Sequence, residues 1–496
     1  VFNTRGNART QGELRRKEAG NVFGEGSRTP ISITLLVKNP KAKTKKAKIH
    51  YYDIGDYLSR EEKLAKIKKF GSISNPKFEW KKISPNEHGD WVNQRSDIFK
   101  DLIPIGDKGK KANKSTYFVP YYSNGLKTQR DAWCYNSSSE VLRGNISRHI
   151  EFYNEQVGRF SDSPADKAEK KRMLDRDPTK ISWTASLEND LVRNKRHELA
   201  SGSLIPAMYR PFYKQHLYFS GDLNERVYQI PRLFPHADVD NRVICVSGLG
   251  GTKESTTIMT NIIPDLNCLD AGTQCFPIYY YDERERNKLS LLDEPGDSEY
   301  VRRDGISDFI LDRAKKQYGK NVTKEDIFYY VYGILHSPDY RKTFANDLKR
   351  MLPRIPLVED VRDFWYFNKA GRKLGDLHIN YEDVPAYAEI TLEGADKRHY
   401  KVEKMRFGKT REEKNGKMRT VDDKSIIHYN SSITISNIPE KAYEYVVNGR
   451  SAIDWIVERY RTTTDTKSGI TNDPNDWADE VGNPRYILDL LLSVIN

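Results

Sequence analysis

The apolar positions of this chain recur in short runs, and their period changes from one part of the sequence to the next. Runs of strand length predict strands at residues 31–37, 49–54, 116–122, 242–247 and 275–281. The first two strands are expected to form a hairpin whose basic tip is the lysine run at 41–48. Residues 31–37, ISITLLV, are expected to be buried because nearly every position is apolar.

Apolar residues at helical spacing predict helices at residues 59–70, 138–159, 439–448, 451–460 and 484–495. Helices also dominate from 306 to 381, where a capping box at Thr323 starts the clearest of them. Ser337 and Pro338 end that helix and start the next, which runs to Pro353. These two helices are expected to pack as a hairpin, and their apolar stripes are typical of core rather than of a cofactor site.

From residue 388 to 436 the period becomes two. This pattern predicts an antiparallel sheet with strands at 388–393, 400–407, 425–429 and 432–436. The long connection at 397–424 holds eleven Lys and Arg residues against five Asp and Glu residues. Such a loop either contacts DNA, with Lys404, Arg406 and Lys409 as candidates, or is simply solvated.

Strands and helices are mixed along the chain, so the predicted fold class is α+β or mixed α/β. The length of 496 residues suggests about three units, and a polar stretch at 161–180 marks one boundary. The predicted units are 1–60, 61–180 and 181–496, the last with parts 181–300, 301–385 and 386–496. The chain opens at Val1 without a methionine, which suggests a piece of a longer protein.

The net charge of +12 and the isoelectric point near 9.1 favour a polyanionic partner, without separating DNA from RNA or an anionic membrane. No stretch reaches the roughly 18 apolar residues of a membrane span, and no signal peptide is present, so a cytoplasmic protein is expected. The four cysteines form no CxxC pair and have no histidine at finger spacing. Reduced thiols and no metal are therefore expected.

The stretch 209–235, YRPFYKQHLYFSGDLNERVYQIPRLFP, combines tyrosines and cations with prolines that fix the backbone. Tyrosines stack on bases and arginines bind phosphates or guanine edges, so this stretch is a candidate DNA-binding surface. The candidate contacts are Arg210, Lys214, Tyr218, Arg226 and Arg232. His216 and His236 are either base readers or structural histidines. The alternative is a tyrosine-rich core segment with ordinary surface cations.

A glycine-rich loop follows the strand at 242–247 and ends at Lys253. A P-loop requires Ser or Thr after its lysine, and here Glu254 follows, so no nucleotide site is predicted. The loop either places Lys253 and its amides against a DNA phosphate or is a plain turn. The sequence has no HExxH, Gly-x-Ser-x-Gly or paired-carboxylate pattern, and no catalytic residue is predicted.

Several segments together carry a family resemblance. NVFGEGSRTPISITLLVKNP resembles the motif that closes the catalytic domain of gamma-type adenine DNA methyltransferases. Together with YRPFYKQHLYF, NERVYQIPRLFP, EDIFYYVYGILHSPDYR and DPNDWADEVGNPRYILDLLL, it resembles the C-terminal part of type ISP restriction-modification enzymes. In that family one polypeptide combines a nuclease, a helicase-like motor, a coupler, a methyltransferase and a target-recognition domain.

The resemblance implies that residues 1–60 supply the C-terminal strands of a Rossmann-like methyltransferase fold, residues 61–180 a spacer, and residues 181–496 the target-recognition domain. Phe23 matches the aromatic that stacks on the flipped adenine, although a core role for its ring is equally open. Arg28 would face the DNA or close the methyltransferase pocket.

The resemblance also implies that the parent protein uses S-adenosylmethionine, and ATP with Mg²⁺. This chain contains neither the Asn/Asp-Pro-Pro-Tyr/Phe motif nor a glycine-rich donor loop. It is therefore expected to bind no cofactor and to methylate nothing alone.

The expected function is sequence-specific recognition of double-stranded DNA in a prokaryotic cytoplasm, which positions a target adenine for methylation and directs ATP-dependent restriction. The expected partners are duplex DNA and the upstream methyltransferase, coupler, motor and nuclease domains. One alternative is a structural coupler that does not read bases. Another is an independent RNA-binding protein, which competition between duplex DNA and RNA would test.

Overall fold

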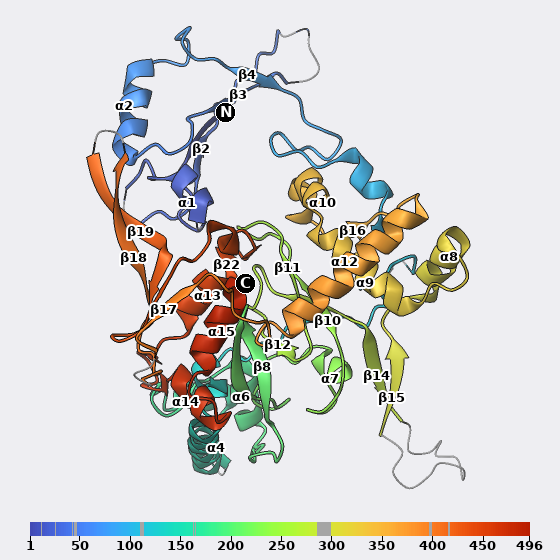
Figure 1. The fold of residues 1–496 in the computed structure, drawn as a ribbon. Helices are drawn as coiled ribbons and strands as arrows, with labels where there is room; N and C mark the ends of the chain where they lie inside the picture. Colours follow the sequence, from blue (N-terminus) through green and yellow to red (C-terminus); the bar gives the residue numbers. More distant parts are fainter. Residues whose placement is uncertain are drawn as a thin grey trace. The chain divides into compact units, whose positions relative to one another are not determined.

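The computed structural model describes residues 1–10, 12–24, 26–41, 43, 47–109, 114–161, 163, 165–284, 299–395, 399–414 and 417–496, and Figure 1 shows the fold. The chain forms two compact units. The first comprises residues 1–102, 249–255 and 338–354, and the second comprises residues 103–248, 256–337 and 355–496. No helix within the described ranges is long and apolar enough to cross a bilayer.

The division into two units differs from the predicted boundaries near residues 60 and 180, because the first unit recruits two segments from the middle of the chain. The three-part division stays a prediction. Small, mostly antiparallel sheets alternate with helices, which confirms the mixed α+β class.

A four-stranded sheet in the order β2-β1-β3-β4 is the main element of the first unit. Its strands are β1 (Phe2–Arg5), β2 (Ile31–Ile33), β3 (Ile49–Asp53) and β4 (Lys81–Ile83). The predicted hairpin of β2 with β3 is wrong, because β1 lies between them and pairs antiparallel with β2 and parallel with β3. Residues 42 and 44–46 of its predicted tip lie outside the described residues.

The prediction of a buried strand at 31–37 is also wrong. The strand ends at Ile33, and Leu36 and Val37 are each 82% exposed. The apolar run misled because β2 is an edge strand of this sheet, so its outer side pairs with no other strand among the described residues.

Helix α2 (Arg60–Phe70) forms as predicted, with Ser59 and Glu62 in a complete capping box. The rings of Phe70, Phe78 and Trp80 pack beside it, with centroids 3.9 Å apart for the first pair and 5.0 Å for the second. A shorter helix, α1 (Gly12–Glu18), precedes the turn that carries Phe23. The three rings of this stack are half-buried.

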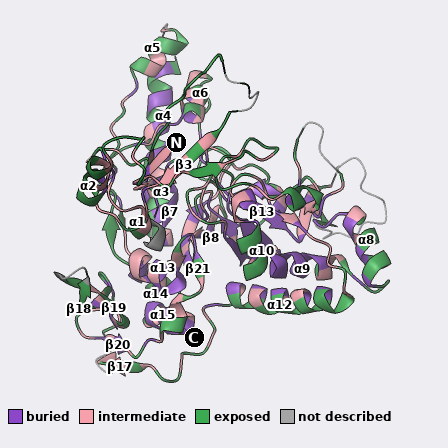
Figure 2. Ribbon diagram, turned by 90° about the horizontal axis from the view of Figure 1, so that it is seen from above, coloured by how far each residue is buried: buried purple, intermediate pink, exposed green. Residues whose placement is uncertain are grey.

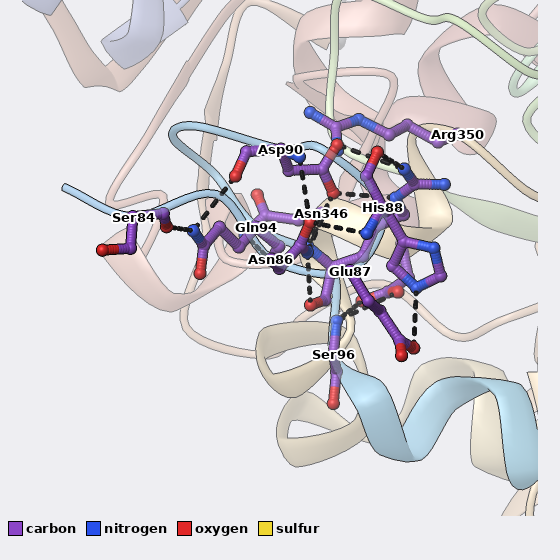
Figure 3. Close-up of polar contacts among 11 residues, drawn as sticks. Ser84, Asn86, Glu87, His88, Asp90, Gln94, Ser96, Asn346 and Arg350 are labelled. Carbon is purple, nitrogen blue, oxygen red and sulfur yellow. Dashed lines mark hydrogen bonds and ion pairs between the residues drawn. The ribbon is translucent and has the colours of Figure 1, made fainter. Parts of the chain in front are cut away.

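A polar network joins separate segments of the first unit (Figure 3). Asp90 accepts a hydrogen bond from Nε of Arg95 at 2.8 Å and pairs with Arg350 at 2.5 Å. The backbone N–H of Ser96 donates to Asp347 at 3.1 Å. Because Arg95 donates to it, the pKa of Asp90 lies well below its usual range. The network ties the loop before helix η1 (Asp97–Asp101) to the segment at 338–354.

The predicted helical hairpin is wrong in its second member. Helix α9 (Lys324–His336) starts at the predicted capping box of Thr323, but the residues after it form two short helices of the first unit, α10 (Pro338–Thr343) and α11 (Ala345–Leu348). Within the second unit α9 packs instead along α12 (Val361–Ile379), as Figure 2 shows. A Cβ atom on Gly371 would lie 1.9 Å from the carbonyl oxygen of Tyr329, so only glycine permits this approach.

The described residues of the second unit form three four-stranded sheets, and two of them have the orders β11-β10-β13-β6 and β12-β8-β9-β7. The strands of the first are β6 (Ser123–Asn124), β10 (Val243–Val246), β11 (Thr257–Thr260) and β13 (Gln274–Pro277). Those of the second are β7 (Tyr135–Asn136), β8 (Leu204–Arg210), β9 (Tyr213–Tyr218) and β12 (Ile263–Pro264). The predicted strand at 242–247 is confirmed as β10, whose four residues are completely buried.

Two strand predictions in this unit need correction. The run at 275–281 breaks at Ile278 into β13 and β14 (Tyr279–Glu283), and β14 pairs with β15 (Tyr300–Asp304). The run at 116–122 forms no strand, and only Phe118 makes a single bridge, to Ile306. Pro120 lacks the N–H that a ladder would need at the centre of this run.

The remaining helices of the second unit surround these sheets. They are α3 (Asp131–Cys134), α4 (Ser139–Ser161), α5 (Lys167–Arg172), α6 (Ala185–Val192), α7 (Ile230–Leu233), α8 (Asp308–Tyr318), α13 (Ala452–Arg459), α14 (Pro474–Glu480) and α15 (Tyr486–Ile495). The predicted helices at 138–159, 451–460 and 484–495 are confirmed as α4, α13 and α15. The predicted helix at 439–448 is wrong: only a 3-10 turn, η4 (Glu440–Tyr443), forms before strand β21 (Val446–Val447).

The predicted antiparallel sheet near the C-terminus is confirmed, with the order β17-β20-β19-β18. Its predicted strand at 400–407 is wrong, because the strand in this region begins only at Arg406. Its strands are β17 (Thr391–Glu393), β18 (Arg406–Lys414), β19 (Lys417–His428) and β20 (Thr434–Ser436). Within the basic connection predicted as a loop, residues 406–414 and 417–424 belong instead to the long ribbon of β18 and β19, and residues 397, 398, 415 and 416 lie outside the described residues. Two short antiparallel pairs follow in the C-terminal segment: β21 with β22 (Arg450–Ser451), and β23 (Thr463–Thr464) with β24 (Thr471–Asn472). The two remaining strands are β5 (Ile103–Pro104) and β16 (Arg354–Ile355).

Candidate nucleic-acid interface

The stretch at 209–235 forms the turn of the β8–β9 hairpin, strand β9 and helix α7. Pro211 and Phe212 are the two turn residues, and Phe212 adopts a positive φ of 58°. Phe212, Tyr213 and Leu217 belong to the largest apolar cluster of the second unit. The prolines therefore fix a hairpin whose aromatic residues are largely core, which favours the alternative interpretation of this stretch for much of its length.

Arg210 lies inside a polar network of the protein. Its Nη1 donates to Asp265 at 2.8 Å, and its guanidinium lies 3.8 Å from the ring centroid of Tyr209. The Arg210 side chain is 13% exposed and that of Asp265 is 1% exposed. Burial raises the pKa of Asp265 to about 6, although Arg210 opposes this shift. The main electrostatic partner of Arg210 in this structure is thus a buried carboxylate.

The other candidates of this stretch differ in their access to solvent. Lys214 pairs with Glu382 at 2.8 Å, and Tyr218 is buried, its hydroxyl accepting a hydrogen bond from the N–H of Ala200. Arg232 pairs with Asp282 at 3.2 Å and is half-exposed. Arg226 is 61% exposed, and of these candidates it is the most accessible to DNA.

The two histidines also have partners. The Nε2 atom of His216 lies 2.9 Å from Glu480, and its ring packs 4.6 Å from that of Trp477. The ring of His236 lies 6.2 Å from that of Tyr300. His216 therefore has a structural role in the second unit, while reading of bases by either histidine stays a prediction.

A pocket of about 340 Å³ opens beside the β8–β9 hairpin. Tyr209 and Tyr213 line it from the hairpin, Asp131 lines it from α3, and Arg459 and Arg461 line it from the end of α13 and the residues that follow. All of these residues belong to the second unit. Arg459 and Arg461 were missed in the sequence, where the only local signal was a pair of arginines before three threonines.

Lys404, a candidate from the basic segment, lies beside Arg461, which lines this pocket. Its backbone forms an antiparallel bridge with that of Arg461, and the N–H of Thr462 donates to the carbonyl oxygen of Glu403 at 3.2 Å. The fold therefore brings the two basic regions singled out in the sequence to one place. They meet through residues that follow α13.

The ribbon of β18 and β19 is exposed on both faces. All residues of 409–413 and 418–420 are exposed, as the colouring in Figure 2 shows. Arg411 pairs with Thr420, and the neighbouring Glu412 pairs with Arg419. Because successive side chains point to opposite faces of a strand, Arg411 and Arg419 lie on opposite faces.

The outer end of the ribbon has no core on either face, so its side chains are accessible to an external partner. Arg406 at the start of β18 is exposed, and Lys409 is exposed while paired with Asp422. These two candidates therefore lie on the ribbon with their side chains accessible to solvent.

Phe23 lies on a turn of the first unit and is 69% exposed, so its ring is not a core aromatic of the described structure. Asn21 fixes this turn: its side chain donates to the carbonyl of Thr29 at 2.8 Å and accepts from the N–H of Phe23 at 2.9 Å. Lys63 on α2 donates to two carbonyl oxygens just before the turn, each at 2.7 Å. Arg28 is also exposed, and stacking by Phe23 stays a prediction.

Lys253 lies in the glycine-rich loop, most of which belongs to the first unit. The N–H of Gly250 donates to the carbonyl of Lys349 at 2.9 Å, and Gly250 adopts a positive φ of 79°. This loop is therefore a turn held by α11 and the residues after it. A phosphate contact by Lys253 stays a prediction.

Two groups of side chains in the described residues have ligand atoms close enough for a metal ion. One is Glu87, His88 and Asp97, which is fully exposed, and the other is Asp190, His197 and Asp222. In each group a lysine already pairs with a carboxylate: Lys100 lies 2.8 Å from Glu87, and Lys195 lies 2.5 Å from Asp222. We assign neither group as a metal site.

The chain is similar to one known protein family and to several solved structures. The family model described as the Type ISP C-terminal specificity domain matches residues 117–490. No curated protein matches the chain. The family match covers both the β8–β9 hairpin and the β18–β19 ribbon.

Three solved structures are similar to the whole chain. A nuclease-deletion mutant of the Type ISP restriction-modification enzyme LlaGI, in complex with a DNA substrate mimic, is 39% identical with a TM-score of 0.82. The ATP-dependent Type ISP restriction-modification enzyme LlaBIII bound to DNA is 36% identical with a TM-score of 0.80, and the DrdV–DNA complex is 28% identical with a TM-score of 0.78. The match covers 100% of this chain in each case, but only 42%, 30% and 46% of those chains, respectively.

Proposed function

Because this chain belongs to the family of the Type ISP C-terminal specificity domain, we propose that it binds double-stranded DNA and reads a target sequence through the β18–β19 ribbon. The observation that carries the proposal is the ribbon itself, exposed on both faces and rich in arginine and lysine. The major groove of B-DNA is about 12 Å wide and admits a two-stranded β-ribbon. Three structural relatives of the chain are DNA complexes, which supports this ligand.

The ribbon would read bases, whereas the cations at its base would bind the DNA backbone. Arginines that reach guanine edges in the groove discriminate between sequences by about 1–3 kcal/mol for each bidentate pair. Cations at the base of the ribbon, such as Lys404 and Arg461, would contact phosphates, which position the duplex and carry no sequence information. Sequence preference and salt dependence should therefore map to different residues.

We further propose that the first unit completes the methyltransferase domain of a longer restriction-modification enzyme. The apolar residues that follow the edge strand β2, among them Leu35, Leu36 and Val37, are exposed in this structure and would be covered there. Phe23 would stack on the target adenine once it is flipped out of the duplex.

The donor S-adenosylmethionine, and ATP with Mg²⁺, would bind to parts of the parent outside this chain, whose sequence lacks the corresponding motifs. The donor would supply the methyl group. The role of this chain would be to hold the duplex so that the correct adenine is presented, and to make restriction by the motor and nuclease domains depend on the bound sequence.

The proposal is tested by incubating the chain with a pool of randomised duplexes at about 0.15 M salt, close to physiological ionic strength, and sequencing the retained fraction. We expect one enriched motif without two-fold symmetry. Retention that falls with salt but shows no motif would refute base reading and favour the structural coupler. Stronger competition by RNA than by duplex DNA would favour an RNA-binding protein.

A further inference from the structure

Three cations from two segments of the second unit lie at or beside the pocket near Tyr209: Arg459 and Arg461 line it, and Lys404 lies next to Arg461. Lys404 precedes the ribbon, Arg459 ends α13, and Arg461 follows two residues later. The backbone bridge between Lys404 and Arg461 sets these two residues side by side. We call Lys404, Arg459 and Arg461 the cation cluster.

Two members of the cation cluster make no ion pair with the residues that the structure describes. Lys404 and Arg461 are both exposed, and neither has a carboxylate within ion-pair distance in the described part of the chain. Their positive charges therefore make no direct ion pair within the described residues and are accessible to an anion from solvent.

The guanidinium group of Arg459 has partners for only some of its hydrogen-bond donors. Its Nη2 atom lies 3.5 Å from Glu458, but Glu458 also pairs with Arg450, so one carboxylate serves two guanidinium groups. The Nε atom of Arg459 is buried and has no hydrogen-bond partner in the described structure. Burial, together with the nearby charges of Arg210 and Arg461, lowers the pKa of Arg459. A buried guanidinium donor without an acceptor favours an anionic ligand.

Two other carboxylates line the pocket, and their nearest partners are not members of the cation cluster. Asp131 accepts a hydrogen bond from the hydroxyl of Tyr209 at 3.2 Å and lies 3.7 Å from Arg210. Asp465 accepts hydrogen bonds from the N–H and the hydroxyl of Ser468, each at 2.8 Å. These partners hold both carboxylates within their own networks, one beside α3 and one in the loop between β23 and β24.

From this arrangement we propose that the cation cluster binds one phosphate group of the DNA backbone. Arg459 would donate to the phosphate oxygens through Nε and a terminal nitrogen, the fork geometry that guanidinium groups use for phosphates. Arg461 and Lys404 would flank the same group. The pocket of about 340 Å³ behind the cluster leaves room for the sugar attached to that phosphate.

This inference rests on the proposed function, because it names the part of DNA that the site takes. A phosphate bound at the base of the ribbon would fix the duplex at one point. The ribbon would then enter the groove in a single register. The contact reads no base.

The test compares Arg461→Gln, Lys404→Gln and Arg459→Lys in the full chain with the wild type. Arg459→Lys keeps the charge but removes the fork. The matched control is Lys401→Gln, an exposed lysine three residues before Lys404 that pairs with Asp479 at 3.3 Å. Melting temperatures of all variants establish that each one folds.

The measurement is the dissociation constant for a target duplex and an unrelated duplex as a function of salt. Each lost phosphate contact should reduce the slope of log K against log salt by about 0.9. We expect this for Arg461→Gln and Lys404→Gln, with equal losses of affinity on both duplexes and no change for Lys401→Gln. Arg459→Lys should weaken both duplexes equally with a smaller change of slope.

The possible outcomes separate this inference from the proposed function. Unchanged slopes in the Arg461 and Lys404 variants would overturn the phosphate site, even if the wild type reads a motif. A wild type without sequence preference would overturn the proposed function, while reduced slopes would still support the site.

A second experiment adds inorganic phosphate at constant ionic strength and measures duplex binding and the melting temperature of each variant. Phosphate that competes with duplex in the wild type but not in Arg461→Gln supports the site. Phosphate that raises the melting temperature through these residues while every duplex slope stays unchanged would identify a free-phosphate site and refute the DNA contact. A chain that binds no duplex even at low salt would refute both proposals.

Discussion

Replacing Arg210 with methionine should destabilise the second unit and leave DNA specificity unchanged. Methionine preserves much of the volume of the side chain but removes the cation that donates to Asp265 at 2.8 Å. Asp265 would keep the hydroxyl of Tyr135 at 3.2 Å and the N–H of Asn267 at 2.8 Å as donors. Removal of one partner from a buried ion pair costs about 3–5 kcal/mol, because the remaining charge has no counter-ion.

The pH dependence of this loss follows from the pKa of Asp265. Burial raises this pKa from 3.8 to about 6 in the folded wild type, so the folded state binds the proton more tightly than the unfolded state. Stability due to this group therefore falls as the pH rises from 4 to 6, by about 3 kcal/mol in total. Without Arg210 the pKa rises further, and the penalty of the variant is full at pH 8 and smaller at pH 5, where the carboxyl is neutral.

Urea unfolding of the wild type and of Arg210→Met at pH 5 and pH 8 measures this effect. The difference in unfolding free energy should be larger at pH 8. The double variant Arg210→Met with Asp265→Asn should recover most of the loss, because it removes the buried charge. A variant of unchanged stability that selects a different duplex motif would refute this argument and restore Arg210 as a base reader.

Three other perturbations test the ribbon, the helix pair and the exposed aromatic. If the ribbon enters the groove with one face, only one of Arg411→Ala and Arg419→Ala should relax the selected motif at one position, by about 1–3 kcal/mol; equal effects on duplex selection would refute insertion by one face. Gly371→Ala should lower the free energy of unfolding by about 1–3 kcal/mol or more, because the new Cβ would lie 1.9 Å from a carbonyl oxygen of α9. The control Gly144→Ala meets nothing within 4 Å and should raise the free energy of unfolding by about 0.5–1 kcal/mol. Thermal unfolding measures both changes. Phe23→Ala should change the unfolding free energy by less than about 0.5 kcal/mol in urea titrations because the ring is 69% exposed, and a larger loss would show that the ring packs.

Local signals in the sequence predicted local structure well. The capping boxes at Ser59 and Thr323 start helices where the sequence places them, and Ser451 caps α13 in the same way. The change to period two near residue 388 predicted the C-terminal antiparallel sheet. These features depend on residues within about four positions of one another, so the sequence alone contains the physical cause.

Pairing between distant elements was not predictable in the same way. An apolar stripe shows that α9 is buried but not that its partner is α12, a choice that depends on glycines such as Gly371 on the facing helix. Strand β1 has only four residues, too few for a periodic signal, and yet it separates β2 from β3. The sequence favours a loop at 397–424 because charged residues obscure the alternation of a ribbon whose outer end is exposed on both faces.

At the candidate site, too, the sequence determined some features and the tertiary structure decided others. The sequence by itself determined that the chain is basic, that tyrosines and arginines cluster near residue 209, and that a second basic segment follows residue 397. Only the tertiary structure decided which charges are paired within the protein and which are exposed: Arg210 is held by a buried aspartate from another segment, while Arg461 lies exposed beside Lys404 across a backbone bridge. A side chain's type sets what it can bind, but its freedom to bind depends on counter-charges that long-range folding brings to it or keeps away.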